Sequence, residues 1–157
     1  MPMHIALLEP EIPPNTGNIA RLCAATESVL HLIGKLGFQI DDRHLRRAGL
    51  DYWPYMTIHI HPTFVDFEKW RLEKGFDPTR VFPLSARGSR PYTRIAFQDG
   101  DCLLFGSESR GLPAEILASQ ADRVIVIPMS TDKVRSLNLS TAAGIVLYEA
   151  LRQLRNW

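Results

Sequence analysis

Short uninterrupted apolar runs alternate with helical patterns along this chain. Six of the runs predict β-strands. Five are continuous, which is typical of strands buried on both faces of a parallel sheet, and one alternates like a half-buried strand. In chain order they span 4–8, 29–33, 57–61 (the alternating run), 81–84, 102–105 and 124–129. We expect the last of these, the most continuous, to be central.

Helical patterns separate most of these strands. One helix over 15–26 is expected to be capped by Asn15 or Thr16, and another begins near Pro113, since proline suits a first helical turn. The remaining patterns span 41–49, 64–71 and 138–154. The alternation predicts an α/β fold with a single open, mostly parallel sheet flanked by helices. No linker or repeat divides residues 1–157, so we expect one domain.

Composition adds few constraints. With 45% hydrophobic residues, 22% charged residues and a net charge of +1, the chain has the balance of an ordinary globular protein. No signal peptide or membrane-spanning stretch is recognisable. Cys23 and Cys102 lie in apolar runs, where buried thiols are more common than reactive ones. We expect a cytoplasmic protein without disulfides or a membrane partner.

Functional side chains gather in the turn that follows the strand at 102–105. Gly106, Glu108, Arg110 and Gly111 stand there with two serines, before a helix start. In parallel sheets such a turn lies at the carboxyl edge, where ligands bind. An ordinary strand-to-helix turn fits these residues equally well.

Basic residues offer further candidates. Asn18 and Arg21 share one face near the start of the first helix and could hold a phosphate, although a surface arginine beside a cap is the simpler interpretation. The clusters at 43–47 and 87–94 could contact a nucleic acid backbone or could simply be solvated. His59 and His61 have no evident third ligand, so we do not expect a metal. Nucleotide-binding glycine motifs and a nucleophile elbow are absent from the sequence.

Four stretches together resemble the SPOUT superfamily of RNA methyltransferases. Within it, the chain is most similar to the minimal bacterial enzymes that methylate the ribose 2′-hydroxyl of the tRNA wobble nucleotide. The similarity extends from about residue 3 to 154. The stretches are 9–23 (EPEIPPNTGNIARLC), 45–52 (LRRAGLDY), 105–113 (FGSESRGLP), and 127–129 (IPM) with 135–140 (RSLNLS).

This resemblance implies a deep trefoil knot in the C-terminal part of the sheet, which forms a pocket for S-adenosylmethionine. It also implies a homodimer built on the first and last helices, with Arg21 of one subunit near the cofactor of the other. The cofactor contacts implied by the resemblance are Leu84, Gly106, Ile127, Met129, Ser136, Leu137 and Asn138.

The implied reaction is attack of a ribose hydroxyl on the methyl carbon of the cofactor. Arg21 matches the catalytic arginine and would bind the adjacent phosphate and stabilise the oxyanion, because a guanidinium remains protonated. Glu108, Asn138 and Ser140 would organise the site. The implied substrate is the anticodon stem-loop of leucine tRNA, with cytidine or a modified uridine at the wobble position. Two alternatives are methylation of ribosomal RNA and a non-catalytic RNA chaperone. Expected RNA contacts are Asn18, Arg21, Arg43, Arg46, Arg47, Arg87, Arg110 and Arg135.

Overall fold

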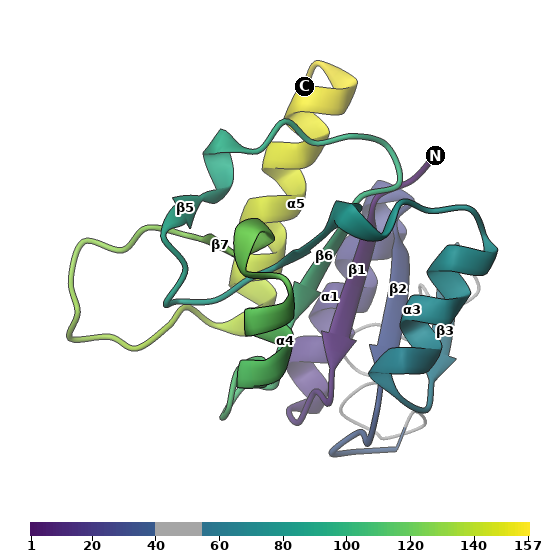
Figure 1. The fold of residues 1–157 in the computed structure, drawn as a ribbon, viewed down its shortest axis with the longest axis horizontal. Helices are drawn as coiled ribbons and strands as arrows, with labels where there is room; N and C mark the ends of the chain where they lie inside the picture. Colours follow the sequence, from purple (N-terminus) through teal and green to yellow (C-terminus); the bar gives the residue numbers. More distant parts are fainter. Residues whose placement is uncertain (40–54) are drawn as a thin grey trace.

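A five-stranded parallel sheet forms the centre of the computed structural model, which describes residues 1–39 and 55–157 (Figure 1). The strand order is β3-β2-β1-β6-β4, and each neighbouring pair is parallel. The sequence prediction of these strands is therefore confirmed. Their bounds are β1 His4–Leu8, β2 Val29–Ile33, β3 Thr57–His61, β4 Val81–Pro83 and β6 Cys102–Phe105.

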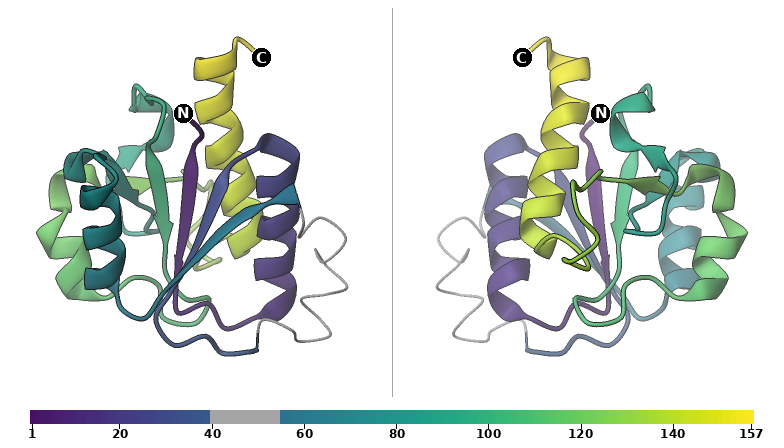
Figure 2. Two further views of the ribbon diagram at one scale, coloured as in Figure 1. Left: turned by 90° about the vertical axis from the view of Figure 1, so that its right-hand side faces the viewer. Right: turned by 90° about the vertical axis from the view of Figure 1, so that its left-hand side faces the viewer.

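Helices cover both faces of this sheet (Figure 2). Helices α1 (Pro13–Thr26) and α5 (Leu139–Arg155) share one face, and α3 (Phe64–Glu73) and α4 (Ala114–Ser119) share the other. Alternate residues of β1 enter the two apolar clusters, because successive strand side chains point to opposite faces. Both sheet faces are thus buried, which explains the continuous apolar strands. The expected helix at 41–49 lies outside the described residues.

The start of α1 differs from the expectation. The helix begins at Pro13, its N-cap residue is Ile12, and no side chain of the N-cap residue caps it. Asn15 and Thr16 are buried within the helix rather than capping it. Two prolines fit the first turn because their fixed φ suits a helix and that turn needs no intrahelical N–H donors.

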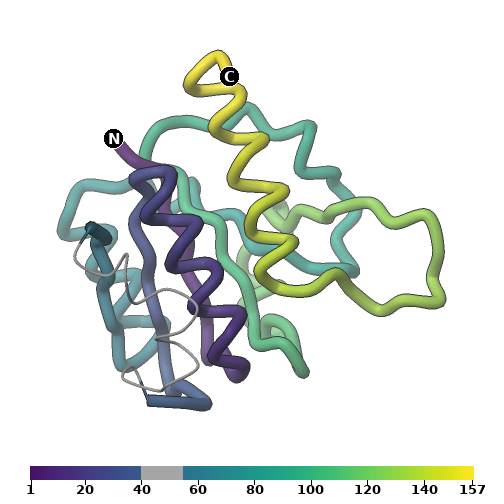
Figure 3. Tube along the Cα trace, turned by 180° about the vertical axis from the view of Figure 1, so that it is seen from behind, coloured from purple at the N-terminus to yellow at the C-terminus, as the bar shows by residue number. Residues whose placement is uncertain are grey.

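The run at 124–129 is not a central strand. Only Ile125–Val126 (β7) is extended, and it pairs with Arg90–Pro91 (β5) in a separate two-stranded sheet. A single bridge from Leu84 to Ile125 connects it to the end of β4. Pro128, two residues after the end of β7, has no N–H to donate and does not support a longer ladder. The segment from 127 to 138 then runs outward and returns to α5 (Figure 3).

Short 3₁₀ turns complete the described structure. They are Pro78–Arg80 (η2), Tyr92–Arg94 (η3) and Ala121–Arg123 (η4). The stretch that carries the basic cluster at 87–94 contains both β5 and η3. Cys23 and Cys102 are buried free thiols, and burial raises the pKa of each to about 12. Within the described residues no helix is long and apolar enough to cross a membrane.

Histidines form a hydrogen-bonded chain on the sheet face under α3. Nδ1 of His4 lies 2.8 Å from Nε2 of His31, and Nδ1 of His31 lies 2.9 Å from Nε2 of His61. Trp70 packs edge-on against His31. Burial lowers the pKa of His4 to about 3 and that of His31 to about 2, so both remain neutral near pH 7.

The buried neutral histidines predict that the folded protein loses stability in acid. Unfolded histidine has a pKa near 6.5, so below that pH the unfolded state binds more protons than the folded state and stability falls. The loss should continue as the pH approaches about 3, the folded pKa of His4. His4→Phe removes one such group while keeping an aromatic ring. Between pH 6.5 and 4.5 it should reduce the pH dependence of the unfolding free energy by about 1 kcal/mol per pH unit. Urea unfolding at a series of pH values tests this. If the unfolding free energy changed equally with pH in the original protein and in His4→Phe, the prediction would be contradicted.

Candidate functional site

Two polar segments meet at the carboxyl edge of the sheet. Strands β1 and β6 are parallel neighbours with Leu7 opposite Phe105, so the segments that leave them lie side by side. One carries residues 9–15 into α1, and the other carries residues 106–112 towards α4. Residues nearly a hundred positions apart are thereby brought into contact.

The carboxylate of Glu108 connects these segments. Its oxygens accept hydrogen bonds from the backbone N–H groups of Glu11 (2.9 Å) and Ile12 (2.8 Å), and from Nδ2 of Asn15 (3.2 Å). A negative charge here is favourable because the start of a helix carries a partial positive charge. Glu108 therefore supports the start of α1, where the N-cap residue offers no side-chain acceptor.

A second carboxylate makes the reciprocal connection. Oε1 of Glu11 accepts hydrogen bonds from the backbone N–H of Ser109 (2.9 Å) and from its hydroxyl (2.6 Å). These bonds from Ser109 are the main reason that the pKa of Glu11 lies below its ordinary value. Each segment thus supplies a carboxylate to the other segment.

Asn15 extends the contact to a third segment. Its Oδ1 accepts a hydrogen bond from Nδ2 of Asn138 at 3.0 Å. Oδ1 of Asn138 in turn accepts bonds from the backbone N–H groups of Ser140 and Thr141 and from the Ser140 hydroxyl, which caps α5. Three predicted site residues, Glu108, Asn138 and Ser140, are therefore joined through Asn15. Sequence analysis missed Asn15 in this role. The signal available in the sequence was the position of Asn15, a polar residue, on the apolar face of the first helix.

Gly106 makes a close backbone contact possible. A Cβ at this position would lie 2.0 Å from the carbonyl carbon of Gly111 and 2.2 Å from the N of Leu112. Gly111 has a φ of +68°, and its N–H donates to the Ser107 carbonyl at 2.8 Å. The turn from 106 to 112 is consequently folded tightly on itself, with Glu108 held at its tip.

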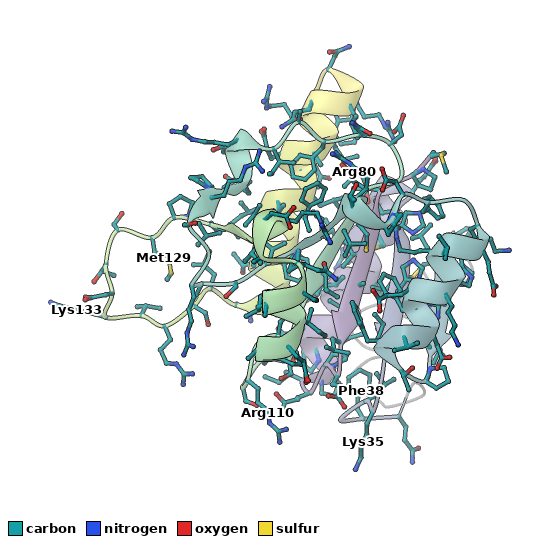
Figure 4. All side chains as sticks on the ribbon, viewed as in Figure 1. Lys35, Phe38, Arg80, Arg110, Met129 and Lys133 are labelled. Carbon is teal, nitrogen blue, oxygen red and sulfur yellow. The ribbon has the colours of Figure 1, made fainter. Side chains whose placement is uncertain are left out.

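The expected cofactor residues lie at neighbouring strand ends and in the segment before α5. The N–H of Leu84 donates to the carbonyl of Leu104, and Leu84 also bridges to Ile125, so the ends of β4 and β6 lie next to the start of β7. Leu84, Ile127 and Met129 are half-buried, whereas Ser136 and Leu137 are exposed. Figure 4 shows Met129 and Lys133 on the segment that extends from the sheet.

The expected RNA contacts occupy several surface segments. Asn18 and Arg21 are exposed on α1, and Arg87, Arg110 and Arg135 are exposed on three different loops. Arg110 extends outward from the turn that carries Glu108 (Figure 4). Arg43, Arg46 and Arg47 lie outside the described residues. The described part of the chain holds no group of three or more His, Cys, Asp or Glu residues placed to bind a metal.

Comparisons with known proteins agree with this geometry. The model of the SpoU rRNA Methylase family matches residues 2–148. A tRNA (cytidine(34)-2′-O)-methyltransferase of Yersinia pestis is 51% identical over 156 residues, covering 97% of this chain and 94% of that protein. A solved structure concerning the 2-OH methylation of C/U34 on tRNA has a TM-score of 0.91 and 48% identity, covering 99% of this chain and 97% of that one. An AdoMet-bound rRNA methyltransferase from Sinorhizobium meliloti has a TM-score of 0.84 and 30% identity, covering 98% of this chain and 57% of that one.

The Glu108 contact predicts a measurable contribution to stability. In Glu108→Gln the amide NH₂ would face a backbone N–H, and the negative charge at the start of α1 would be lost. We expect the free energy of unfolding to fall by about 1–3 kcal/mol. Glu115→Gln, at an exposed position in the first turn of α4, is the matched control and should change it by less than about 0.5 kcal/mol. Equal effects of the two substitutions in urea unfolding would refute this role of Glu108.

Proposed function

The chain belongs to the SpoU rRNA Methylase family, and from this premise we propose that it methylates the ribose 2′-hydroxyl of nucleotide 34 in tRNA, with S-adenosylmethionine as donor. The named activity of the Yersinia relative and the AdoMet-bound Sinorhizobium structure support the reaction and the donor. The observation that carries the proposal is the contact of Glu108, Asn15 and Asn138, which joins three of the sequence segments that resemble this enzyme class.

The residues expected to contact the cofactor suit an adenosine and a sulfonium. Leu84, Ile127 and Met129 offer half-buried apolar surface at adjoining strand ends, and Leu137 adds exposed apolar surface. Backbone groups of Gly106 and Ser136 and the side chain of Asn138 would supply hydrogen bonds. When bound, S-adenosylmethionine supplies an electrophilic methyl group. The protein chiefly has to hold the ribose oxygen in line with that group, because positioning can provide much of the rate.

Arg21 has the central chemical role in this proposal. A ribose hydroxyl is a poor nucleophile near neutral pH, so negative charge developing on its oxygen must be stabilised. A guanidinium remains protonated and donates in a planar fork that suits phosphate, so Arg21 binds the neighbouring phosphate and stabilises the oxyanion. Glu108, Asn138 and Ser140 act as positioning residues that hold the segments around it.

The RNA would be recognised through its anticodon loop. Unpaired bases there can be splayed and stacked, and the 2′-hydroxyl distinguishes RNA from DNA. Exposed Asn18, Arg87, Arg110 and Arg135 are proposed phosphate contacts, together with Arg43, Arg46 and Arg47. We propose leucine tRNAs with cytidine or a modified uridine at position 34 as the substrates, which places the reaction in the cytoplasm.

The knot and the homodimer belong to the same proposal. Pairing of β7 beyond the end of β4, followed by return of the chain to α5 beside α1, supports a threaded C-terminal part. Ile12 at the start of α1 and Tyr148 on α5 are 44% and 47% exposed, which offers apolar surface for a second copy. In that dimer Arg21 would act next to the donor of the partner subunit.

Methyl transfer to tRNA tests the proposed function. Purified protein with methyl-labelled S-adenosylmethionine should label ribose 34 of tRNA taken from cells that lack this activity. Arg21→Ala should lower the rate by about a hundredfold or more, as loss of an oxyanion-stabilising donor does, with donor binding retained. Lys69→Ala removes an exposed charge on α3, on the opposite sheet face, and should retain the rate.

Other outcomes separate the alternatives. Label in ribosomal RNA instead of tRNA would favour rRNA methylation, which the family description and the Sinorhizobium relative suggest. Donor binding without transfer to either RNA would favour a non-catalytic chaperone and would refute the proposed reaction.

A further inference from the structure

A small cavity lies under α3, on the sheet face opposite α1 and α5. Its volume is about 30 Å³, and its lining is mostly aromatic and aliphatic. Three lining residues are polar or charged, namely Glu68, Arg71 and Gln120. None of them belongs to the site proposed above. Arg71 and Gln120 come from α3 and from the residue after α4, so the cavity lies where these two elements meet.

Arg71 is buried with most of its hydrogen-bonding capacity unused. The residue is only 2% exposed, and its Nη2 donates a hydrogen bond to the carbonyl of Gly100 at 3.1 Å. The guanidinium carbon lies 4.5 Å from the centre of the Phe76 ring. Among the described residues, however, Nε and Nη1 are buried without a hydrogen-bond partner. Oε1 of Gln120, a residue 6% exposed, is buried without a partner as well.

The charge of Arg71 is also without a counter-ion in the described structure. Glu68 lines the same cavity and is exposed, but it makes no ion pair with Arg71. After burial, the positive charge of Arg71 contributes to the lowered pKa of His4 and of His31, and it offsets part of the rise that burial causes in the pKa of Cys102. Near pH 7 the two imidazoles are neutral and the thiol is protonated, so none of the three provides a negative charge. An unpaired buried charge of this kind is costly.

We propose that this cavity binds one small monovalent anion of about the size of chloride. Nε and Nη1 of Arg71 have almost no accessible surface in the described arrangement, so the side chain would turn towards the ion to donate to it, and the amide of Gln120 would turn about its last torsion to present NH₂ in place of oxygen. One water needs about 10–15 Å³ of such a volume, so there is room for a halide but none for a bulky organic anion. Water would accept hydrogen bonds from these donors but would leave the positive charge of Arg71 uncompensated. An anion would accept the hydrogen bonds and also compensate the charge.

Anion binding would then contribute to the stability of the fold. A ligand that binds only the folded state raises the folding equilibrium constant by a factor of 1 + [L]/Kd. For a dissociation constant of about 20 mM, 200 mM chloride would raise it about tenfold. Sodium gluconate at the same ionic strength serves as the reference, because gluconate is too large for the cavity. The expected result is about tenfold weaker folding in gluconate, measured by urea unfolding.

Gln120→Glu provides a matched variant that keeps the shape of the side chain. Its carboxylate would supply the counter-ion to Arg71 from within the chain, so folding should become independent of chloride in the comparison with gluconate. Glu115→Gln, outside the cavity, should keep the chloride dependence of the original chain. A Gln120→Glu protein with unchanged chloride dependence, or an original chain that folds equally well in both salts, would overturn the proposal.

Crystals grown or soaked in sodium bromide give an independent measurement. We expect an anomalous scattering peak in the cavity beside the Arg71 guanidinium, and its absence in Gln120→Glu. Water alone at this position, or a bromide peak without any chloride dependence of folding, would overturn the proposed stabilising site. Neither measurement involves RNA or S-adenosylmethionine, so failure here is distinguishable from failure of the methyl transfer.

Discussion

The carboxylate of Glu108 is the contact on which the organisation of the carboxyl edge depends. It accepts bonds from N–H donors of the segment that enters α1, while Glu11 of that segment accepts bonds from Ser109. Asn15, one of the donors, also accepts from the residue that caps α5. A continuous set of hydrogen bonds therefore orients two helices and one turn relative to the end of the sheet. Helix packing alone fixes positions less closely, because apolar contacts have little directionality.

Polar groups are partnered differently at the carboxyl edge of the sheet and on the sheet face under α3. At the carboxyl edge the charged carboxylates are met by donors from both backbone and side chains. Under α3, imidazoles stay neutral by burial and bond to one another, and a guanidinium has unused donors. The first arrangement is satisfied within the chain, whereas the second leaves a positive charge for something outside the chain to compensate. Whether a polar group in this protein is satisfied therefore depends on the partners that surround it.

Much of this fold could be predicted from the sequence, since strands buried on both faces must be continuously apolar, and family membership followed from four local stretches. The start of α1 could not. Its support comes from a residue 96 positions further along the chain, and propensity for capping is a local property. The run at 124–129 failed for a similar reason. Its apolar character is genuine, but whether it pairs depends on where β4 ends and on Pro128. The helical pattern over 64–71 does not reveal that Arg71 is buried, because nothing local shows that Gly100 and Phe76 enclose its guanidinium.

Gly106 has a consequence for any attempt to retarget the protein. With the backbone of Gly111 and Leu112 so near that no β-carbon fits, residue 106 cannot vary, and Gly111 is held by its left-handed backbone. The exposed side chain of Arg110, which lies between the two glycines in the sequence, carries no such steric restriction. A library that keeps both glycines, Glu108 and Ser109, whose hydroxyl donates to Glu11, while randomising position 110 would therefore sample new surface chemistry on an unchanged scaffold.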